Sequence, residues 1–469
     1  MYTSITDAAA ALRSGETTSV DLVREGYALA DAHDAELGVY LARYDETALA
    51  AAEKADAELA SGTDRGPLHG IPIGVKDIIT TEEGETTAQS LVLDRSWGVG
   101  DAPVVARLRA AGAVITGKLT TMEYAIGMPD VTKPFPLPRN PWNTAHYSGG
   151  SSSGTGGGVA AGFVLGGLGT DTGGSVRWPA AVDGITGMKQ TFGRVPKNGC
   201  VPLGYSYDNI GPMARSAADC AAMLTVMAGH DPQDACSVDR PVDDYLSGLT
   251  GSLAGMRIGL DTLKAHSGEF WDPALDGLLS DAVTALEAAG ATVVEVDLPL
   301  YEELKTITMS GFCAEAYAYH RPDLQSHWPD FAAGTRAAVI DGALISGGDY
   351  VQMQRVRRVG QRLLAELYAD AGIDLIVTPT TSEPAPLFDD MKLADLIPSL
   401  HTPYWNAVGN PAMSVPMGFG AAGLPMGLQL CGKPFAEATV FAAGHAYQQQ
   451  TDWHTRVPAM ITDSSALAA

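Results

Sequence analysis

One lysine stands inside an apolar segment where a charged side chain is unusual. Residues 71–79 read IPIGVKDII, so Lys76 falls within a predicted strand. Burial of its ammonium group is costly unless the group is paired or neutral. The adjacent Asp77 could pair with it in a structural role. Alternatively, lowering the pKa of Lys76 by about three units, at a cost of roughly 4 kcal/mol, would give a neutral amine that accepts a proton from a serine.

Glycine is concentrated in two later segments, both of which contain serine. Residues 146–158 read HYSGGSSSGTGGG and residues 169–177 read GTDTGGSVR. Glycine permits positive φ and close backbone approach at an entropic cost, so we expect these segments to shape a site. Serine–lysine catalysis is a known variant of the serine triad, although no serine stands three residues before a lysine in this chain.

Three other motifs give weaker signals. Residues 112–118 match GxxxxGK, but Leu119 follows where a P-loop has Ser or Thr, so nucleotide binding is not expected. The glycines from Gly154 onward do not clearly follow a strand, which weakens the case for a dinucleotide loop. Residues 150–154 fit the GxSxG nucleophile elbow, with Ser152 as nucleophile. That mechanism needs a histidine base, and no context singles out one of the downstream histidines His230, His401, His445 and His454.

Composition restricts the class of protein. Of 469 residues, 30 are basic and 55 acidic, which gives a formal net charge of −25. The negative field of such a protein disfavours binding to nucleic acids and anionic membranes. The five cysteines are scattered and form no CxxC pair, so no disulfide framework is expected. There is neither a signal-peptide pattern at the start nor a run of about 18 apolar residues. We expect a cytoplasmic protein that binds neither nucleic acid nor membranes.

The order of predicted elements indicates an α/β fold. The first sixty residues read as helices, and a strand at 113–116 follows a helix at 104–111. Beyond residue 250, strand and helix patterns alternate. These patterns cover strands at 256–260, 292–296 and 374–377 and helices at 274–289 and 351–369.

The lysine and the two glycine-rich segments together resemble the amidase signature family. Lys76 lies 75 residues before Ser151, and Ser151 lies 24 residues before Ser175, which is the order and spacing of that family. The matching segments are 70–77 (GIPIGVKD), 149–154 (GGSSSG), 169–180 (GTDTGGSVRWPA), 208–215 (DNIGPMAR), 378–380 (TPT) and 423–429 (GLPMGLQ). The resemblance spans nearly the whole chain.

The resemblance carries an expected fold. It implies an α/β protein in which a large mixed β-sheet core is covered by helices on both faces. It also implies a single domain over residues 1–469. Within it, N-terminal helices occupy about 1–60, the signature core about 70–220, and the remainder completes the sheet and the substrate pocket.

The resemblance also assigns roles to residues. Ser175 becomes the nucleophile, Ser151 the proton bridge, with a cis peptide bond before it, and Lys76 the base. The backbone N–H groups of an oxyanion hole would come from Thr172, Gly173, Gly174 and Ser175. Supporting positions are Ser152, Asp171 and Arg177. Neither a metal nor an organic cofactor is implied.

The chain departs from the family pattern at two places. Residues 153–157 read SGTGG where the family often has GGSAA, and Trp178 replaces the usual aliphatic residue after the arginine. The first is interpreted as a packing variation, and neither departure touches the three catalytic positions.

The expected activity is hydrolysis of carboxamide C–N bonds through an acyl-enzyme. Variable segments at 126–138, 205–207 and 401–405 are expected to form the pocket. An apolar, aromatic-lined pocket is suggested by Met128, Phe135, Tyr205, Tyr207 and Trp405. This favours an aryl or apolar amide, while an aryl carbamate (urethane) or ester remains an alternative substrate for the same triad.

Other hypotheses remain open. The chain could be the glutaminase subunit of a tRNA-dependent amidotransferase, active only with partner subunits, although an apolar pocket is unlike a glutamine site. A catalytically dead binding protein is disfavoured because all three catalytic positions are present. The sequence does not fix the oligomeric state, and a homodimer is compatible with the resemblance.

Overall fold

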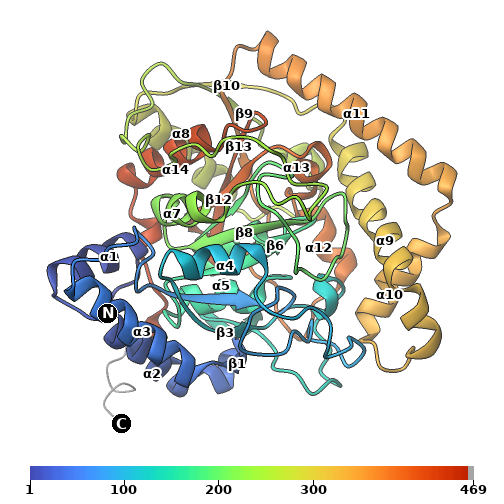
Figure 1. The fold of residues 1–469 in the computed structure, drawn as a ribbon. Helices are drawn as coiled ribbons and strands as arrows, with labels where there is room; N and C mark the ends of the chain where they lie inside the picture. Colours follow the sequence, from blue (N-terminus) through green and yellow to red (C-terminus); the bar gives the residue numbers. More distant parts are fainter. Residues whose placement is uncertain (463–469) are drawn as a thin grey trace.

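The computed structural model describes residues 1–462, which are built around one mixed sheet flanked by helices (Figure 1). Across this eleven-stranded sheet the order is β1 (Tyr40–Arg43), β3 (Val114–Leu119), β2 (Pro72–Lys76), β6 (Gly166–Asp171), β8 (Asn209–Ala214), β7 (Thr186–Lys189), β12 (Ala412–Phe419), β13 (Pro425–Gly432), β11 (Leu375–Pro379), β9 (Arg257–Leu260) and β10 (Thr292–Glu295). A separate two-stranded ribbon consists of β4 (Arg139–Asn140) and β5 (Asn143–Tyr147). The α/β prediction is confirmed.

The helices are interleaved with these strands along the chain. In the first half they are α1 (Ile5–Ser14), α2 (Ser19–Leu37), α3 (Asp45–Ala60), α4 (Pro103–Ala110), α5 (Ser153–Ala160), α6 (Arg177–Asp183) and α7 (Ala217–Met227). In the second half they are α8 (Leu275–Ala288), α9 (Tyr301–Ser326), α10 (Ala333–Asp341), α11 (Gly347–Asp370), α12 (Leu393–Ser399), α13 (Pro403–Val408) and α14 (Glu437–Gln450). Helix α2 begins at Ser19, where the Thr18 hydroxyl accepts a hydrogen bond from the Asp21 amide and caps the helix.

Parallel pairing brings two strand ends to the same edge of the sheet. Strand β2 lies between β3 and β6 and is parallel to both. The carboxyl ends of β2 and β6 therefore meet at one edge, where the chain leaves the sheet. Helix α5 packs close to this region, and at Gly154 a Cβ atom would lie 2.5 Å from the Thr120 amide nitrogen. The unusual glycines of this segment thus permit close packing of α5.

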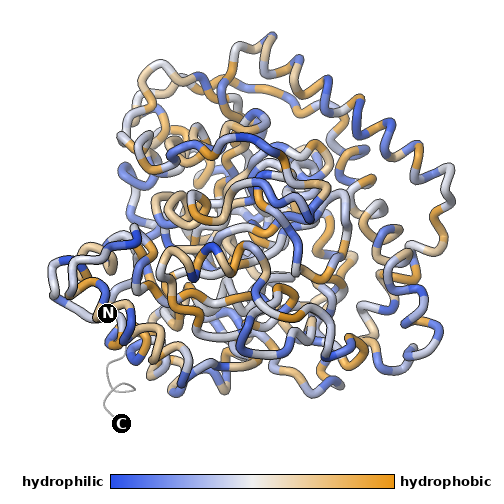
Figure 2. The backbone as a smooth tube through the Cα atoms, viewed as in Figure 1, coloured by the Kyte–Doolittle hydropathy of each residue, from blue (hydrophilic) through white to orange (hydrophobic). Residues whose placement is uncertain are grey.

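Two groups of helices lie at opposite sides of the sheet. Helices α1 to α3 gather at one side of Figure 1, and α9 to α11 at the other. Helix α11 carries many polar residues, and hydrophilic segments recur along it in Figure 2. Helix α9 packs against α10, α11 and α13. Within residues 1–462, no helix combines the length and the apolar character that crossing a bilayer requires.

Candidate active site

The predicted catalytic residues come together at the edge where β2 and β6 end. Lys76 is the last residue of β2, and Thr170 is the penultimate residue of β6. Ser151 lies just before Ser152, the N-cap residue of α5, and Ser175 lies just before Val176, the N-cap residue of α6. The peptide bond between Gly150 and Ser151 is cis. Two strand ends and two helix starts therefore place a lysine and two serines in one region.

The Lys76 amine is surrounded by hydroxyl groups. Its Nζ atom lies 2.8 Å from Ser151 Oγ, 2.8 Å from Thr170 Oγ1 and 3.1 Å from Ser152 Oγ. The side chain is fully buried, and burial lowers the pKa of Lys76 to about 7, although the more distant Cys200 and Asp171, among others, act in the opposite direction. An amine with this pKa is substantially neutral near pH 7.

The alternative ion pair between Lys76 and Asp77 is not formed. Asp77 instead lies 3.2 Å from the Nζ atom of Lys118, and both of these side chains are buried. Lys118 also donates to the Ile79 carbonyl at 2.6 Å and to Thr86 Oγ1 at 2.8 Å. Lys118 is therefore the structural lysine of this region, and Lys76 has hydroxyl groups as its direct partners.

The Ser152 hydroxyl is held beside the Lys76 amine by hydrogen bonds. Its hydroxyl donates to the Thr170 carbonyl at 3.2 Å and accepts from the Thr170 amide at 3.1 Å. The Ser152 side chain is fully buried, and it does not line the cavity described below, whereas Ser151 and Ser175 do. Within residues 1–462 no histidine lines that cavity either. This geometry does not favour the nucleophile-elbow hypothesis.

A buried ion pair holds the segment before Ser175. Arg177 donates to both carboxylate oxygens of Asp171, at 2.8 and 2.9 Å, and both side chains are fully buried. Burial alone would raise the pKa of Asp171, but the Arg177 charge and its hydrogen bonds outweigh that effect and lower it to about 2. Arg177 also bonds to Asn406 Oδ1 and Gln429 Oε1, at 2.6 and 2.7 Å. The pair therefore links β6 to the C-terminal part of the chain.

The candidate oxyanion segment has one amide already in use. The Gly174 N–H donates to Asp171 Oδ1 at 2.9 Å. The backbone N–H groups of Thr172, Gly173 and Ser175 are the remaining candidates from the predicted set. Gly174 itself has φ of 130°, in the region that favours glycine, and an added Cβ would collide with the Thr402 side chain.

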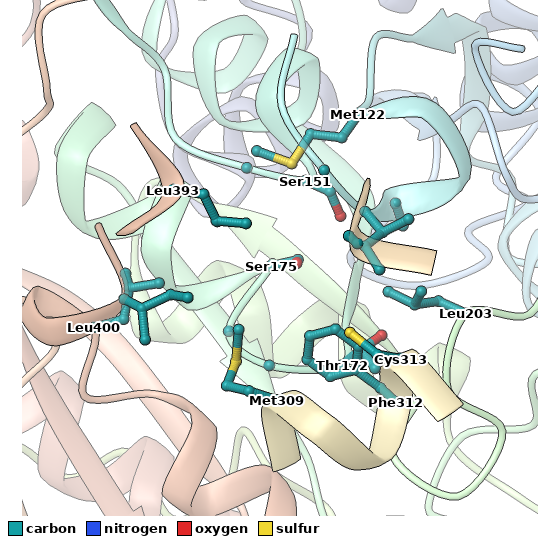
Figure 3. A pocket seen from close by; sticks show the side chains of 18 of the residues that line it. Met122, Ser151, Thr172, Ser175, Leu203, Met309, Phe312, Cys313, Leu393 and Leu400 are labelled. Atoms are coloured by element: carbon teal, nitrogen blue, oxygen red, sulfur yellow. The ribbon is translucent and has the colours of Figure 1, made fainter. Parts of the chain in front are cut away.

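Ser151 and Ser175 open onto a cavity of about 370 Å³. Figure 3 shows Met309, Phe312 and Cys313 on one wall and Leu393 and Leu400 on another. The remaining walls include Met122, Ile126, Met128, Trp178, Leu203, Leu396 and Ile397. The cavity is thus lined mainly by aliphatic and thioether side chains. Within residues 1–462, its lining includes one charged side chain, Asp341, and no lysine, arginine or histidine.

The predicted aromatic lining needs correction. Among the five predicted pocket residues, Met128 lines the cavity, whereas Phe135, Tyr205, Tyr207 and Trp405 lie elsewhere. Trp405 is fully buried among apolar side chains. The Tyr207 ring packs beneath the Arg357 guanidinium, 4.5 Å from its centroid, and the half-exposed Tyr205 holds Lys197 at 4.3 Å in the same way. These aromatic rings are used in packing and in cation contacts.

Several lining residues were missed from the sequence. Met309, Phe312 and Cys313 follow the i, i+3, i+4 spacing of one helix face, a signal that could have marked a wall but not the cavity it faces. Trp178 stood out as a departure from the family pattern and lines the cavity, 5.9 Å from the Tyr147 ring. Thr170, a direct partner of Lys76, carried no signal beyond its place in the glycine-rich segment.

Residues 1–462 hold no group of three or more His, Cys, Asp or Glu side chains arranged to bind a metal ion. The polar groups gathered around Ser151 and Ser175 are hydroxyl groups, the Lys76 amine and backbone amides.

Comparisons with known proteins define the family. The family model described as Amidase matches residues 21–441. The chain is 40% identical to the A subunit of glutamyl-tRNA(Gln) amidotransferase from Methylococcus capsulatus, over 98% of this chain and 99% of the relative. The chain therefore belongs to the amidase signature family, whose enzymes act on C–N bonds.

Solved structures agree with this assignment. The native peptide amidase of Stenotrophomonas maltophilia superposes with a TM-score of 0.83 at 32% identity, covering 96% of both chains. A chain from a vestigial protein complex, linked to the evolutionary origins of an s-triazine catabolic enzyme, gives 0.87 at 30% identity, covering 95% of this chain and 98% of the other. The eleven-stranded sheet flanked by helices matches the fold of amidase signature structures.

Proposed function

We propose that this chain hydrolyses the C–N bond of amides with an apolar body, with Ser175 as nucleophile, Ser151 as proton bridge and Lys76 as base. The observation that carries the proposal is the buried Lys76 amine, which lies 2.8 Å from Ser151 and has a pKa of about 7. A base with a pKa near the working pH combines the correct protonation state with useful basicity.

The hydrogen bonds around Lys76 favour one direction of proton flow. The Ser152 hydrogen is committed to the Thr170 carbonyl, so Ser152 can only accept from the amine. A neutral amine has two hydrogens and one lone pair. Donation to Ser152 and Thr170 Oγ1 leaves the lone pair for the hydroxyl hydrogen of Ser151.

The reaction then proceeds in two halves. Ser175 gives its proton to Ser151 as Ser151 gives its own to Lys76, and the Ser175 oxygen bonds to the substrate carbonyl carbon. The amides of the oxyanion segment stabilise the resulting negative oxygen. The same proton returns through Ser151 to the leaving nitrogen as the C–N bond breaks, leaving an acyl-enzyme. Water repeats the sequence, releasing the acid and restoring Ser175.

The lining of the cavity supports an apolar amide as substrate. Its aliphatic and thioether walls offer favourable burial to an alkyl or aryl group. A carbamate or an ester also presents a carbonyl carbon to Ser175, so the proposal extends to these two classes of substrate.

A second candidate function rests on the relatives. Relatives at 39–40% identity over 97–98% of this chain are named as the A subunit of glutamyl-tRNA(Gln) amidotransferase, and these names favour a glutaminase that works with partner subunits. Free glutamine carries an α-carboxylate, whose binding in a largely apolar cavity calls for a cationic or polar partner. The lining within residues 1–462 offers hydroxyl groups, such as those of Ser310 and Thr402, but no lysine, arginine or histidine to balance that negative charge, which favours the apolar amide.

The test compares substrates on the purified chain alone. We expect turnover of an apolar anilide or primary amide, with loss of kcat in Ser175→Ala and a loss of about 10²- to 10⁴-fold in Lys76→Ala. Lys189→Met is the matched control, since Lys189 is also a fully buried lysine but bonds to the Asn410 carbonyl at 2.6 Å instead of to a serine. Activity that required glutamine and added partner subunits would overturn the proposal in favour of the second candidate.

A further inference from the structure

The cavity that reaches Ser175 changes character toward its outer end. Its inner part contains Ser151 and the half-buried Ser175, and its outer part contains the exposed side chains of Leu393 and Asp341. Asp341 is the last residue of α10 and lines the cavity. A substrate whose amide reaches Ser175 and whose other end extends to this exposed part of the lining would lie near the Asp341 carboxylate.

Asp341 is set apart from the other lining residues by its charge. It is the one charged side chain in the lining, and within residues 1–462 it forms no ion pair and no side-chain hydrogen bond. Burial is the main cause that raises the pKa of the Cys313 thiol, which also lines the cavity, and the Asp341 charge acts in the same direction. Lys392, although adjacent to the lining residue Leu393, is not part of the lining.

The residues beside Asp341 are apolar and open to solvent. Ile340 is 38% exposed and Leu344 83% exposed, and Ile345 lines the cavity. An apolar ledge beside an unpaired carboxylate is complementary to an alkyl ammonium, whose methylene groups can lie on the ledge while the charge meets the acid. The net charge of −25 acts in the same direction by attracting cations to the surface.

We propose that Asp341 is a specificity-determining residue that selects substrates carrying a cationic group, such as an ammonium, at the end remote from the scissile amide. This inference rests on the proposed function for the identity of Ser175 as the reacting group. The proposed substrate then has two parts: an apolar body beside the scissile amide, and a positively charged end that lies near Asp341.

The test uses a pair of probes that differ in charge. Covalent modification of Ser175 is followed with 4-(2-aminoethyl)benzenesulfonyl fluoride and with its neutral N-acetyl derivative, each rate being divided by the rate of hydrolysis in buffer. In the unmodified protein at low salt we expect the cationic probe to react faster. Asp341→Asn should lower the cationic rate by about fivefold and leave the neutral rate unchanged, because an exposed ion pair contributes at most about 1 kcal/mol. Added salt at about 0.5 M should remove most of the preference.

The control removes the same charge elsewhere. Asp239 is exposed and does not line the cavity, so Asp239→Asn should keep the full preference for the cationic probe. Equal rates for both probes in the unmodified protein would overturn the inference. So would an Asp341→Asn variant that slows both probes alike, or one that changes neither. The inference and the proposed function fail separately, because the neutral probe reports whether Ser175 reacts at all.

Discussion

The protonation of Lys76 should control how fast Ser175 reacts. An ordinary lysine has a pKa of 10.5, and the change to about 7 corresponds to roughly 5 kcal/mol in favour of the neutral amine. The cause is burial: the side chain has no exposed surface, and its direct partners are three hydroxyl groups, which do not neutralise a positive charge. Only the neutral amine can accept a proton from Ser151.

The sign of the pH dependence follows from this requirement. Below pH 7 the amine is protonated and the base is lost, so the labelling rate of Ser175 by a fluorophosphonate should fall about tenfold for each pH unit. Above pH 7 the rate should reach a plateau. Stopped labelling reactions between pH 5.5 and 9.5, analysed by intact-protein mass spectrometry, give the midpoint directly, and peptide mapping confirms the modified serine.

A second buried lysine provides the control for this midpoint. Burial lowers the pKa of Lys189 to about 7 as well, with the Arg177 charge acting in the same direction. Lys189→Met should leave the midpoint near pH 7, whereas Lys76→Ala should abolish both the midpoint and most of the rate. A midpoint above pH 9 in the unmodified protein, or one that disappears with Lys189 alone, would refute the reasoning about Lys76.

Two further predictions concern stability and cavity shape. Arg177→Met leaves the fully buried Asp171 carboxylate without its charge partner, and we expect a loss of about 3–5 kcal/mol in the free energy of unfolding by urea. Arg13→Met removes the exposed ion pair with Asp64 and should lower that free energy by less than about 1 kcal/mol. An equal loss in both variants would contradict this. Met309→Trp narrows the cavity, so kcat/KM for a bulky anilide should fall at least about tenfold relative to a small primary amide, whereas Tyr205→Phe, outside the cavity, should leave that ratio unchanged.

The strand that carries Lys76 and the two glycine-rich segments were predictable because their signals are local. Lys76 lies within nine residues that read as a strand, and the strand is present as Pro72–Lys76. The alternation of side chains along a strand could also have excluded the ion pair between Lys76 and Asp77, because consecutive residues of a strand point to opposite faces. The actual partner of Asp77 is Lys118, on the neighbouring strand β3, and strand pairing is not evident from the sequence alone.

The walls of the cavity could not be predicted for a related reason. They come from α9 and α12 as well as from segments near Met122 and Leu203, which are brought together only by the packing of distant parts of the chain. An aromatic residue in a variable segment has no sequence mark that separates a pocket wall from a packing role. Trp405 illustrates the point, because it is two residues beyond Pro403 in α13 and fully buried against other helices.

Burial alone does not determine which groups of the site are charged, because two fully buried groups differ in charge state near pH 7. Asp171 and Lys76 are both fully buried, yet Asp171 keeps its charge with a pKa of about 2 and Lys76 gives its charge up near pH 7. The difference lies in the partners: Asp171 faces the forked guanidinium of Arg177, and Lys76 faces hydroxyl groups. Environments that drive neighbouring titratable groups apart are the means by which a fold separates a fixed support from a working base. In this chain Arg177 supplies the countercharge that keeps Asp171 ionised, whereas the direct partners of Lys76 within residues 1–462 are hydroxyl groups and include no carboxylate, which leaves its amine uncharged near pH 7.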